Sequence, residues 1–178
     1  MSVAVPAIAH EIGKTQVTAT FAPDGRCQFD LVVDPDALLT KLAVLKGEAP
    51  PGALRRDLRD MRIAALGPTL LDAVHVSFDG VPAPMHFEYR PASAISDFAE
   101  APSTVRLSGA RPRGARTFTF VQGLAMGAYA LNVRIGDSPA QTIWLDGPAP
   151  SEAISLAPPA PATRAAIAWQ HVRLGFTH

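Results

Sequence analysis

Apolar and polar residues alternate in two segments near the start of the chain, residues 15–21 and 27–33. In both segments every second residue is apolar, at Val17, Ala19 and Phe21 and then at Phe29, Leu31 and Val33. A period of two predicts strands with one buried face. Between them, Ala22-Pro23-Asp24-Gly25 favours a hairpin turn, because proline presets φ and glycine accepts positive φ.

Helical spacing replaces this alternation after residue 33. Asp34-Pro35-Asp36 combines a capping acid, a proline suited to the first helical position and a second acid that favours the helix dipole. The apolar stripe of this first helix is Leu38, Leu39, Leu42 and Leu45, and Gly47 is placed to end it.

A second helix is predicted after the breaker at residues 49–52, with Gly67-Pro68 as its end. We expect one face to pack on the core and the opposite face to be solvated. The core-facing stripe is expected to be Leu54, Leu58, Met61 and Ala65. The solvated face is expected to be Arg55, Arg56, Asp57, Arg59 and Asp60.

Short alternating strands return from about residue 73 and are separated by glycine-rich turns. Their apolar positions run from Val74, Val76 and Phe78 to Ile143 and Leu145. This pattern predicts a mainly β fold. The specific expectation is an immunoglobulin-like antiparallel β-sandwich, with two short helices inserted after the second strand and a C-terminal helix.

Composition is that of one globular domain without a charged surface field. The chain has 178 residues, of which 48% are hydrophobic and 18% charged, and its formal net charge is zero. A neutral chain has no basic field for phosphates, so we expect no nucleic-acid partner. Cys27 is the only cysteine, which excludes an internal disulfide, and we expect it to have a structural or neutral role.

The two ends of the chain differ in character from its middle. Residues 1–9 are apolar and end in Ala7-Ile8-Ala9, a small-x-small triplet that is typical of a signal-peptidase site. We interpret residues 1–9 as the remnant of an export signal, so that His10 begins the mature chain. Residues 10–157 are then the extracytoplasmic β-sandwich domain.

Residues 158–178 are interpreted as a linker and a helix that leads to a membrane region. Pro148 to Pro161 holds five prolines in fourteen residues. A helix from about residue 163 to 176 is apolar nearly all round, which is typical of a helix that is buried or approaches lipid. Trp169 and Arg173 in this helix are residue types favoured at a membrane interface.

The last five residues, Leu174-Gly175-Phe176-Thr177-His178, resemble the start of the membrane part of HupE/UreJ-type (hydrogenase/urease accessory) proteins. Ala9-His10-Glu11 resembles the mature start of the family's exported domain, and Gly127-Ala128-Tyr129 resembles one of its late strands. The resemblance implies a periplasmic domain attached to the inner membrane through transmembrane helices that follow residue 178. It implies nickel or related metal handling for the compact members of the family, and it leaves the protein partner open.

No enzyme motif is present, so we expect no catalytic residues and no enzyme. The candidate metal ligands are His10, His75 and His86, for copper or nickel, since amine and imidazole nitrogens suit these ions. His75 and His86 are expected to be neighbours across a hairpin closed by Asp79-Gly80. No other cofactor is expected.

Three classes of function stay open at this point. The first is a non-catalytic extracytoplasmic module of a HupE/UreJ-like membrane protein. The second is a periplasmic copper- or nickel-binding domain that uses the mature N-terminal histidine. The third is a binding module or enzyme of unknown substrate on a sandwich scaffold, which a fold alone neither favours nor excludes.

Overall fold

The computed structural model describes residues 15–92, 102–125 and 127–157 of the chain. In these ranges it has the helices α1 (Pro35–Leu45), α2 (Arg56–Ala65) and α3 (Gly67–Ala73). Its strands are β1 (Gln16–Phe21), β2 (Arg26–Val33), β3 (Val74–Phe78), β4 (Val81–Pro82), β5 (His86–Arg90), β6 (Ser103–Ala110), β7 (Thr117–Gln122), β8 (Ala128–Ile135), β9 (Gln141–Asp146) and β10 (Ile154–Ser155).

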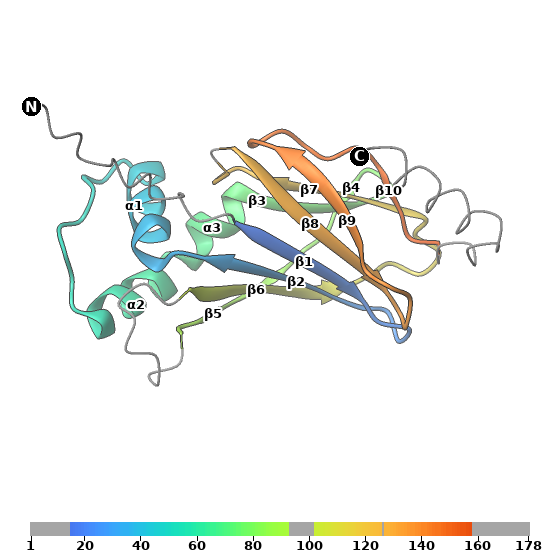
Figure 1. Cartoon of the computed structure of the whole chain (residues 1–178), viewed down its shortest axis with the longest axis horizontal. Helices are drawn as coiled ribbons and strands as arrows, with labels where there is room; N and C mark the ends of the chain where they lie inside the picture. Colours follow the sequence, from blue (N-terminus) through green and yellow to red (C-terminus); the bar gives the residue numbers. More distant parts are fainter. Residues whose placement is uncertain (1–14, 93–101, 126, 158–178) are drawn as a thin grey trace, which may run out of the picture.

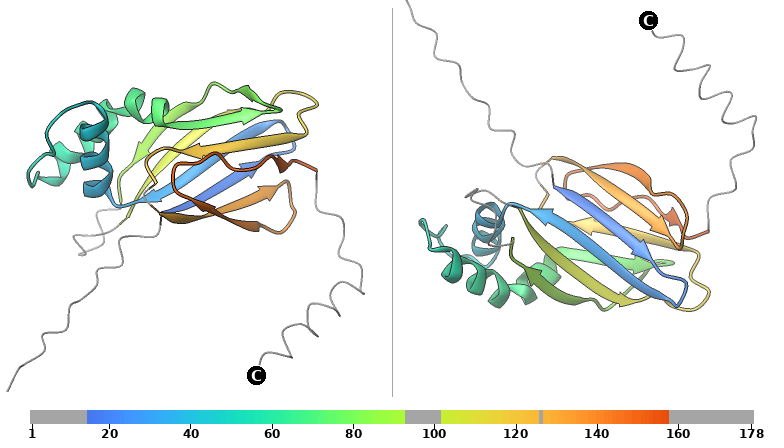
Figure 2. Two further views of the ribbon diagram at one scale, coloured as in Figure 1. Left: turned by 90° about the horizontal axis from the view of Figure 1, so that it is seen from above. Right: turned by 60° about the horizontal axis from the view of Figure 1, so that its bottom comes forward.

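The strands form two sheets that pack face to face, with the three helices gathered at one end (Figures 1 and 2). One sheet has six strands in the order β5-β6-β2-β1-β8-β9, and the other has four in the order β10-β7-β3-β4. Alternate residues of each central strand are buried between the sheets, as in the pattern of β2. The predicted mainly β sandwich is therefore confirmed, while an immunoglobulin-like strand order stays a prediction.

Aromatic rings fill the centre of the core. Phe29 stacks on Phe120, with their ring centroids 5.4 Å apart. The ring centroids of Phe21 and Phe118 are 4.7 Å apart. These four side chains are at most 1% exposed and come from β1, β2 and β7, so they join the two sheets. Offset and edge contacts between rings add to the stabilisation from buried area alone.

One strand pair in the described sheets departs from the antiparallel arrangement that was expected of the sandwich. β1 and β8 run parallel, with Gln16 opposite Ala130 and Phe21 opposite Ile135. Parallel neighbours need a long connection, and here it is most of the domain: the chain passes through the helices and the second sheet before β8 returns beside β1.

The ends of α1 follow the predicted capping chemistry. The side chain of Asp34 accepts a hydrogen bond from the Ala37 N–H at 2.8 Å, and Pro35 occupies the first turn. Gly47 has φ +76° and donates to the Val44 carbonyl, while the Glu48 N–H donates to the Ala43 carbonyl. This pair of bonds is a Schellman ending, which requires a left-handed residue and so explains the glycine.

The predicted orientation of the second helix is wrong. α2 buries Arg59 and Ile63, whereas Leu58 and Met61 are 42% and 64% exposed. Ile63 sits in the core, and Arg59 lies between carboxylates of α1 and α2, with Nη1 3.1 Å from Asp36 Oδ2 and Nε 3.1 Å from Asp60 Oδ1. A satisfied arginine and one well-packed isoleucine thus outweigh the more regular apolar stripe.

Two helices were expected after the second strand, and the described chain has three there. Gly67-Pro68 does end α2, but it also begins α3, since proline fits the first turn of a helix where its missing N–H has no intrahelical partner. The predicted signal remnant at residues 1–9 and the predicted C-terminal helix lie outside the described residues. No helix within the described ranges has the length and apolar character needed to cross a bilayer.

The β3–β4 turn gives a testable pH dependence. Asp79 has φ +47°, and its carboxylate accepts bonds from the Thr117 hydroxyl, the Thr117 N–H and the Arg116 N–H. These bonds, the Thr117 hydroxyl first, lower the pKa of Asp79 below its usual 3.8. A lowered pKa means that the stabilisation is complete above the unfolded-state value and is lost as the pH falls through the folded-state value.

We therefore expect Asp79→Asn to lower the melting temperature at pH 7, and the gap to the parent to close well below pH 3.8. Asparagine tolerates positive φ, so the turn itself is kept, while the charge and one of the two acceptor oxygens are removed. Thermal unfolding of both proteins across this pH range measures the gap. A gap that is as wide in acid as at neutral pH would contradict the role assigned to the carboxylate.

Candidate binding groove

The structure separates the predicted metal ligands. His75 lies on β3 opposite Val121 of β7, whereas His86 lies on β5 opposite Ser108 of β6, in the other sheet. Both side chains are exposed, on the outward faces of the two sheets. The expected hairpin contact is therefore wrong, because β3 turns into the two-residue β4 and the chain then crosses to the other sheet.

His10 lies outside the described residues, so copper or nickel binding at the N-terminus stays a prediction. Within the described ranges, no three side chains of His, Cys, Asp or Glu gather as they would around a metal ion. Cys27 is buried, and burial raises the pKa of its thiol. This agrees with the structural role expected for it.

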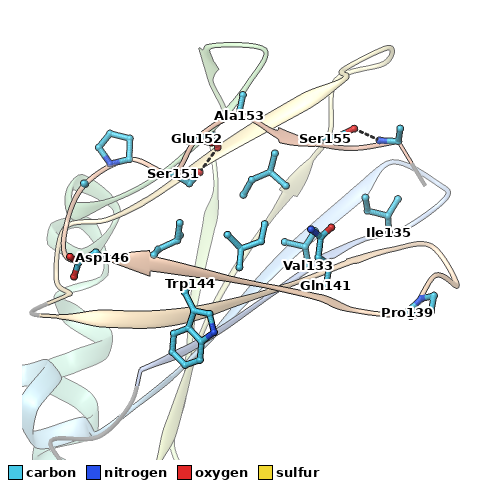
Figure 3. A pocket seen from close by; sticks show the side chains of 16 residues that line it. Val133, Ile135, Pro139, Gln141, Trp144, Asp146, Ser151, Glu152, Ala153 and Ser155 are labelled. Carbon is cyan, nitrogen blue, oxygen red and sulfur yellow. Dashed lines mark hydrogen bonds between the residues drawn. The ribbon is translucent and has the colours of Figure 1, made fainter. Parts of the chain in front are cut away.

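A groove of about 760 Å³ lies between β9 and the segment that carries β10 (Figure 3). Within the described chain, β9 pairs only with β8 and β10 only with β7, so the groove runs between the edges of the two sheets. Its apolar lining comes from Val133, Ile135, Ile143, Leu145 and Ile154. A cavity of this size is typical of ligand-binding sites in proteins.

The register of the large sheet explains why the groove is apolar. Ile143 lies opposite Leu131 and Leu145 opposite Tyr129, and these two partners are buried in the core. Ile143 and Leu145 therefore point inward like their neighbours. The smaller sheet ends at the two-residue β10, so these two side chains are only partly buried.

Hydrogen bonds hold the wall opposite β9 in place. The Ser151 N–H donates to the Phe120 carbonyl at 2.9 Å, and the Ser151 hydroxyl oxygen accepts from the Phe120 N–H at 3.0 Å. Further along, the Leu156 N–H donates to the Arg116 carbonyl, and Leu156 is 5% exposed. The groove is thus bounded by a fixed edge on each side, which favours one preformed shape.

The charged residues that line the groove are both acidic, Asp146 and Glu152, on either side of the turn that joins β9 to the opposite wall. Trp144 also borders the groove, but its side chain points away from it (Figure 3) and is 68% exposed. The lining holds hydroxyl groups but no histidine, lysine, arginine or cysteine. Its chemistry is that of an apolar binding surface with a negative end.

Sequence reasoning did not find this groove. The alternation of Ile143 and Leu145 predicted a strand with one buried face, and it gave no sign that the face would be only half covered. The edge strand β10 has only two residues, Ile154 and Ser155, and this short length is what leaves the groove open.

No family model matches the chain, and no curated protein matches it.

Proposed function

We propose that this chain is the non-catalytic extracytoplasmic domain of a HupE/UreJ-type membrane protein, and that it docks an extended apolar peptide segment in the groove beside β9. The observation that carries the docking role is the half-covered inner face of β9, whose outer edge pairs with no further strand in the part of the chain that the structure describes. The membrane context rests on the resemblance of residues 174–178 and on the apolar helix expected before them.

An extended peptide fits this groove better than a compact ligand. The edge of β9 offers main-chain groups to a further strand, and Ile143 and Leu145 are spaced by two residues, as the inward side chains of an added strand would be. Strand addition of this kind takes its affinity from main-chain hydrogen bonds and its specificity from alternate side chains.

The charge of the groove favours a basic residue at one end of its occupant. Asp146 and Glu152 lie near the closed end, and no cation among the lining residues offsets them. Both side chains are exposed, and Asp146 is on the same face of β9 as Trp144, so the two carboxylates would attract a lysine or arginine of the bound segment from the rim of the groove. The occupant that we propose is therefore a strand with alternate apolar residues whose only charged residue is a lysine or arginine at this end.

The position of the groove supports a role close to the membrane. Ala157, the last described residue, lines it, and residues 158–178 follow directly. Under the proposed membrane attachment, a segment bound there lies next to the point at which the chain leaves the sandwich. The groove would then dock an exported segment of the same membrane protein or of a protein bound to it.

Ile143→Lys is expected to weaken binding of such a segment about thirtyfold, since it replaces roughly 2 kcal/mol of apolar burial by a charge to be desolvated. Fluorescence anisotropy with a labelled peptide of alternating valine and threonine, ending in lysine, measures the affinity. Thr142→Lys is the matched control, because residue 142 is adjacent on β9 and exposed on the opposite face. If both variants bound the peptide with equal affinity, or if the parent chain did not bind it, the proposed docking role would be contradicted.

The membrane context has a separate test. We expect the reading frame to continue beyond His178 into several apolar helices and to begin upstream of Met1 with an export signal. Sequencing the flanking DNA decides both points. A stop codon directly after His178 in an intact gene would contradict membrane attachment and leave the peptide-binding test unaffected.

A further inference from the structure

The exposed apolar side chains of this domain gather on its helical end. Among the described residues, seven large hydrophobic side chains are exposed, and four of them belong to the helices: Val44 and Leu45 on α1, Leu58 and Met61 on α2. Glu48, just after α1, bonds to Arg62 of α2 at 2.7 Å, so the C-terminal turn of α1 lies beside α2. The helices sit at one end of the sandwich (Figure 1).

The spacing on α2 is that of a helix–helix seam. Leu58, Met61 and Ala65 are exposed and follow one another at intervals of three and four residues. This is the spacing at which one helix presents a continuous apolar stripe to a second helix. The stripe begins at Leu58, because Leu54 is partly buried against the core.

The charges that flank this stripe favour a second copy of the same helix in parallel orientation. Asp57 lies along one border and Arg62 along the other, five residues later. In a parallel pair this offset places Asp57 of one copy beside Arg62 of the other, twice by symmetry. In an antiparallel pair Arg62 would instead face Arg55 or Arg62 of the other copy, and like charges would repel.

Asp57 and Arg62 already form ion pairs within the monomer, and these pairs do not prevent the two residues from pairing across the dimer. Arg62 bonds to Glu48, and Asp57 lies 3.3 Å from Arg55, with all four side chains at least about a third exposed. Exposed ion pairs contribute little to stability and are readily replaced.

We propose that α2 pairs in parallel with α2 of a second copy of this chain, about a two-fold axis that runs along the two helices. Three side chains form a short seam, so the dimer is weak and its population depends on concentration. This surface is on α2, and the inference is independent of the groove at β9.

Sedimentation equilibrium on the 178-residue chain tests the pairing. We expect the 18.8 kDa monomer to give way to a particle of twice that mass as the protein concentration rises toward the millimolar range. Met61→Lys is expected to raise the dissociation constant at least tenfold. Val81→Lys is the matched control, because Val81 is 67% exposed on β4 and outside the helices, and this variant is expected to dimerise like the parent.

Two further sets of variants test the orientation. Asp57→Arg alone is expected to weaken the dimer, and Asp57→Arg combined with Arg62→Asp to restore it, because the pair is re-formed with its signs reversed. Leu58→Cys and Ala65→Cys, made singly, are each expected to cross-link to the same residue of the second copy under an oxidant. In an antiparallel dimer at most one of them would do so. Cys27 is buried and serves as the internal control.

The inference is overturned if the parent chain stays at 18.8 kDa at millimolar concentration, or if folded Met61→Lys dimerises as the parent does. Circular dichroism establishes that each variant is folded. Binding of α2 to lipid vesicles or to another protein, without self-association, overturns it as well.

Discussion

Replacing Phe29 by alanine is expected to lower the free energy of unfolding by about 3–5 kcal/mol, the usual cost of removing a fully buried ring. Phe29 is 0% exposed, stacks on Phe120 and makes edge contacts with Phe21 and Phe118, so it joins both sheets. The surrounding rings belong to strands paired within the two sheets, so we expect them to fill the space only in part. Chemical denaturation followed by far-ultraviolet circular dichroism measures the loss.

Trp144→Ala is the control for this prediction. Trp144 belongs to the same sheet as Phe29 but is 68% exposed, so its removal is expected to change stability by no more than about 0.5 kcal/mol. If the two variants were equally destabilised, the contacts between the sheets would not be the source of the effect.

Removing the buried charge of α2 is expected to have the second largest effect. Arg59→Ala should cost about 2–3 kcal/mol, because the half-buried carboxylate of Asp60 loses its nearer cation and keeps the more distant Arg56, whose Nε lies 4.0 Å away. The side chains of Arg59 and Asp60 are 9% and 16% exposed, and the Tyr89 hydroxyl donates to Asp60 at 2.9 Å. Urea-induced unfolding at neutral pH measures the difference.

The control on the same helix is Arg55→Ala. Arg55 is 76% exposed and pairs with Asp57, an arrangement that contributes about 0–1 kcal/mol. Arg59→Met keeps much of the side-chain volume and removes the charge, so it separates the effect of charge from that of packing. The double variant Arg59→Met/Asp60→Asn is expected to be more stable than Arg59→Met alone, because it leaves no unpaired carboxylate at residue 60. A loss for Arg59→Ala no greater than that for Arg55→Ala would show that the network does not hold α2 in place.

Local chemistry made the strands and the first helix predictable. The alternation of Val17, Ala19 and Phe21 identifies a strand because neighbouring residues point to opposite faces whatever lies beyond them. Asp34 and Gly47 mark the ends of α1 because each satisfies main-chain groups only a few residues away. The β-sandwich class follows from such short-range signals.

The choice between competing faces was not predictable. α2 carries a regular apolar stripe through Leu58 and Met61, and a second face with Ile63 and Arg59. Burial of the second face depends on Asp36, more than twenty residues earlier in the chain, and on Asp60 held by Tyr89 of β5. No spacing within the helix contains this information, so the sequence pattern favoured the wrong face.

The sequence by itself determined that the chain forms β1, β2 and α1 and where α1 begins and ends, because these choices depend on groups within one or two turns of the chain. Tertiary structure alone decided the parallel pairing of β1 with β8, the separation of His75 from His86 and the open groove beside β9. Each of these depends on which distant segment covers a given face. Which segment covers which face depends on the total apolar surface that both sheets bury together, and no local sequence pattern contains this information.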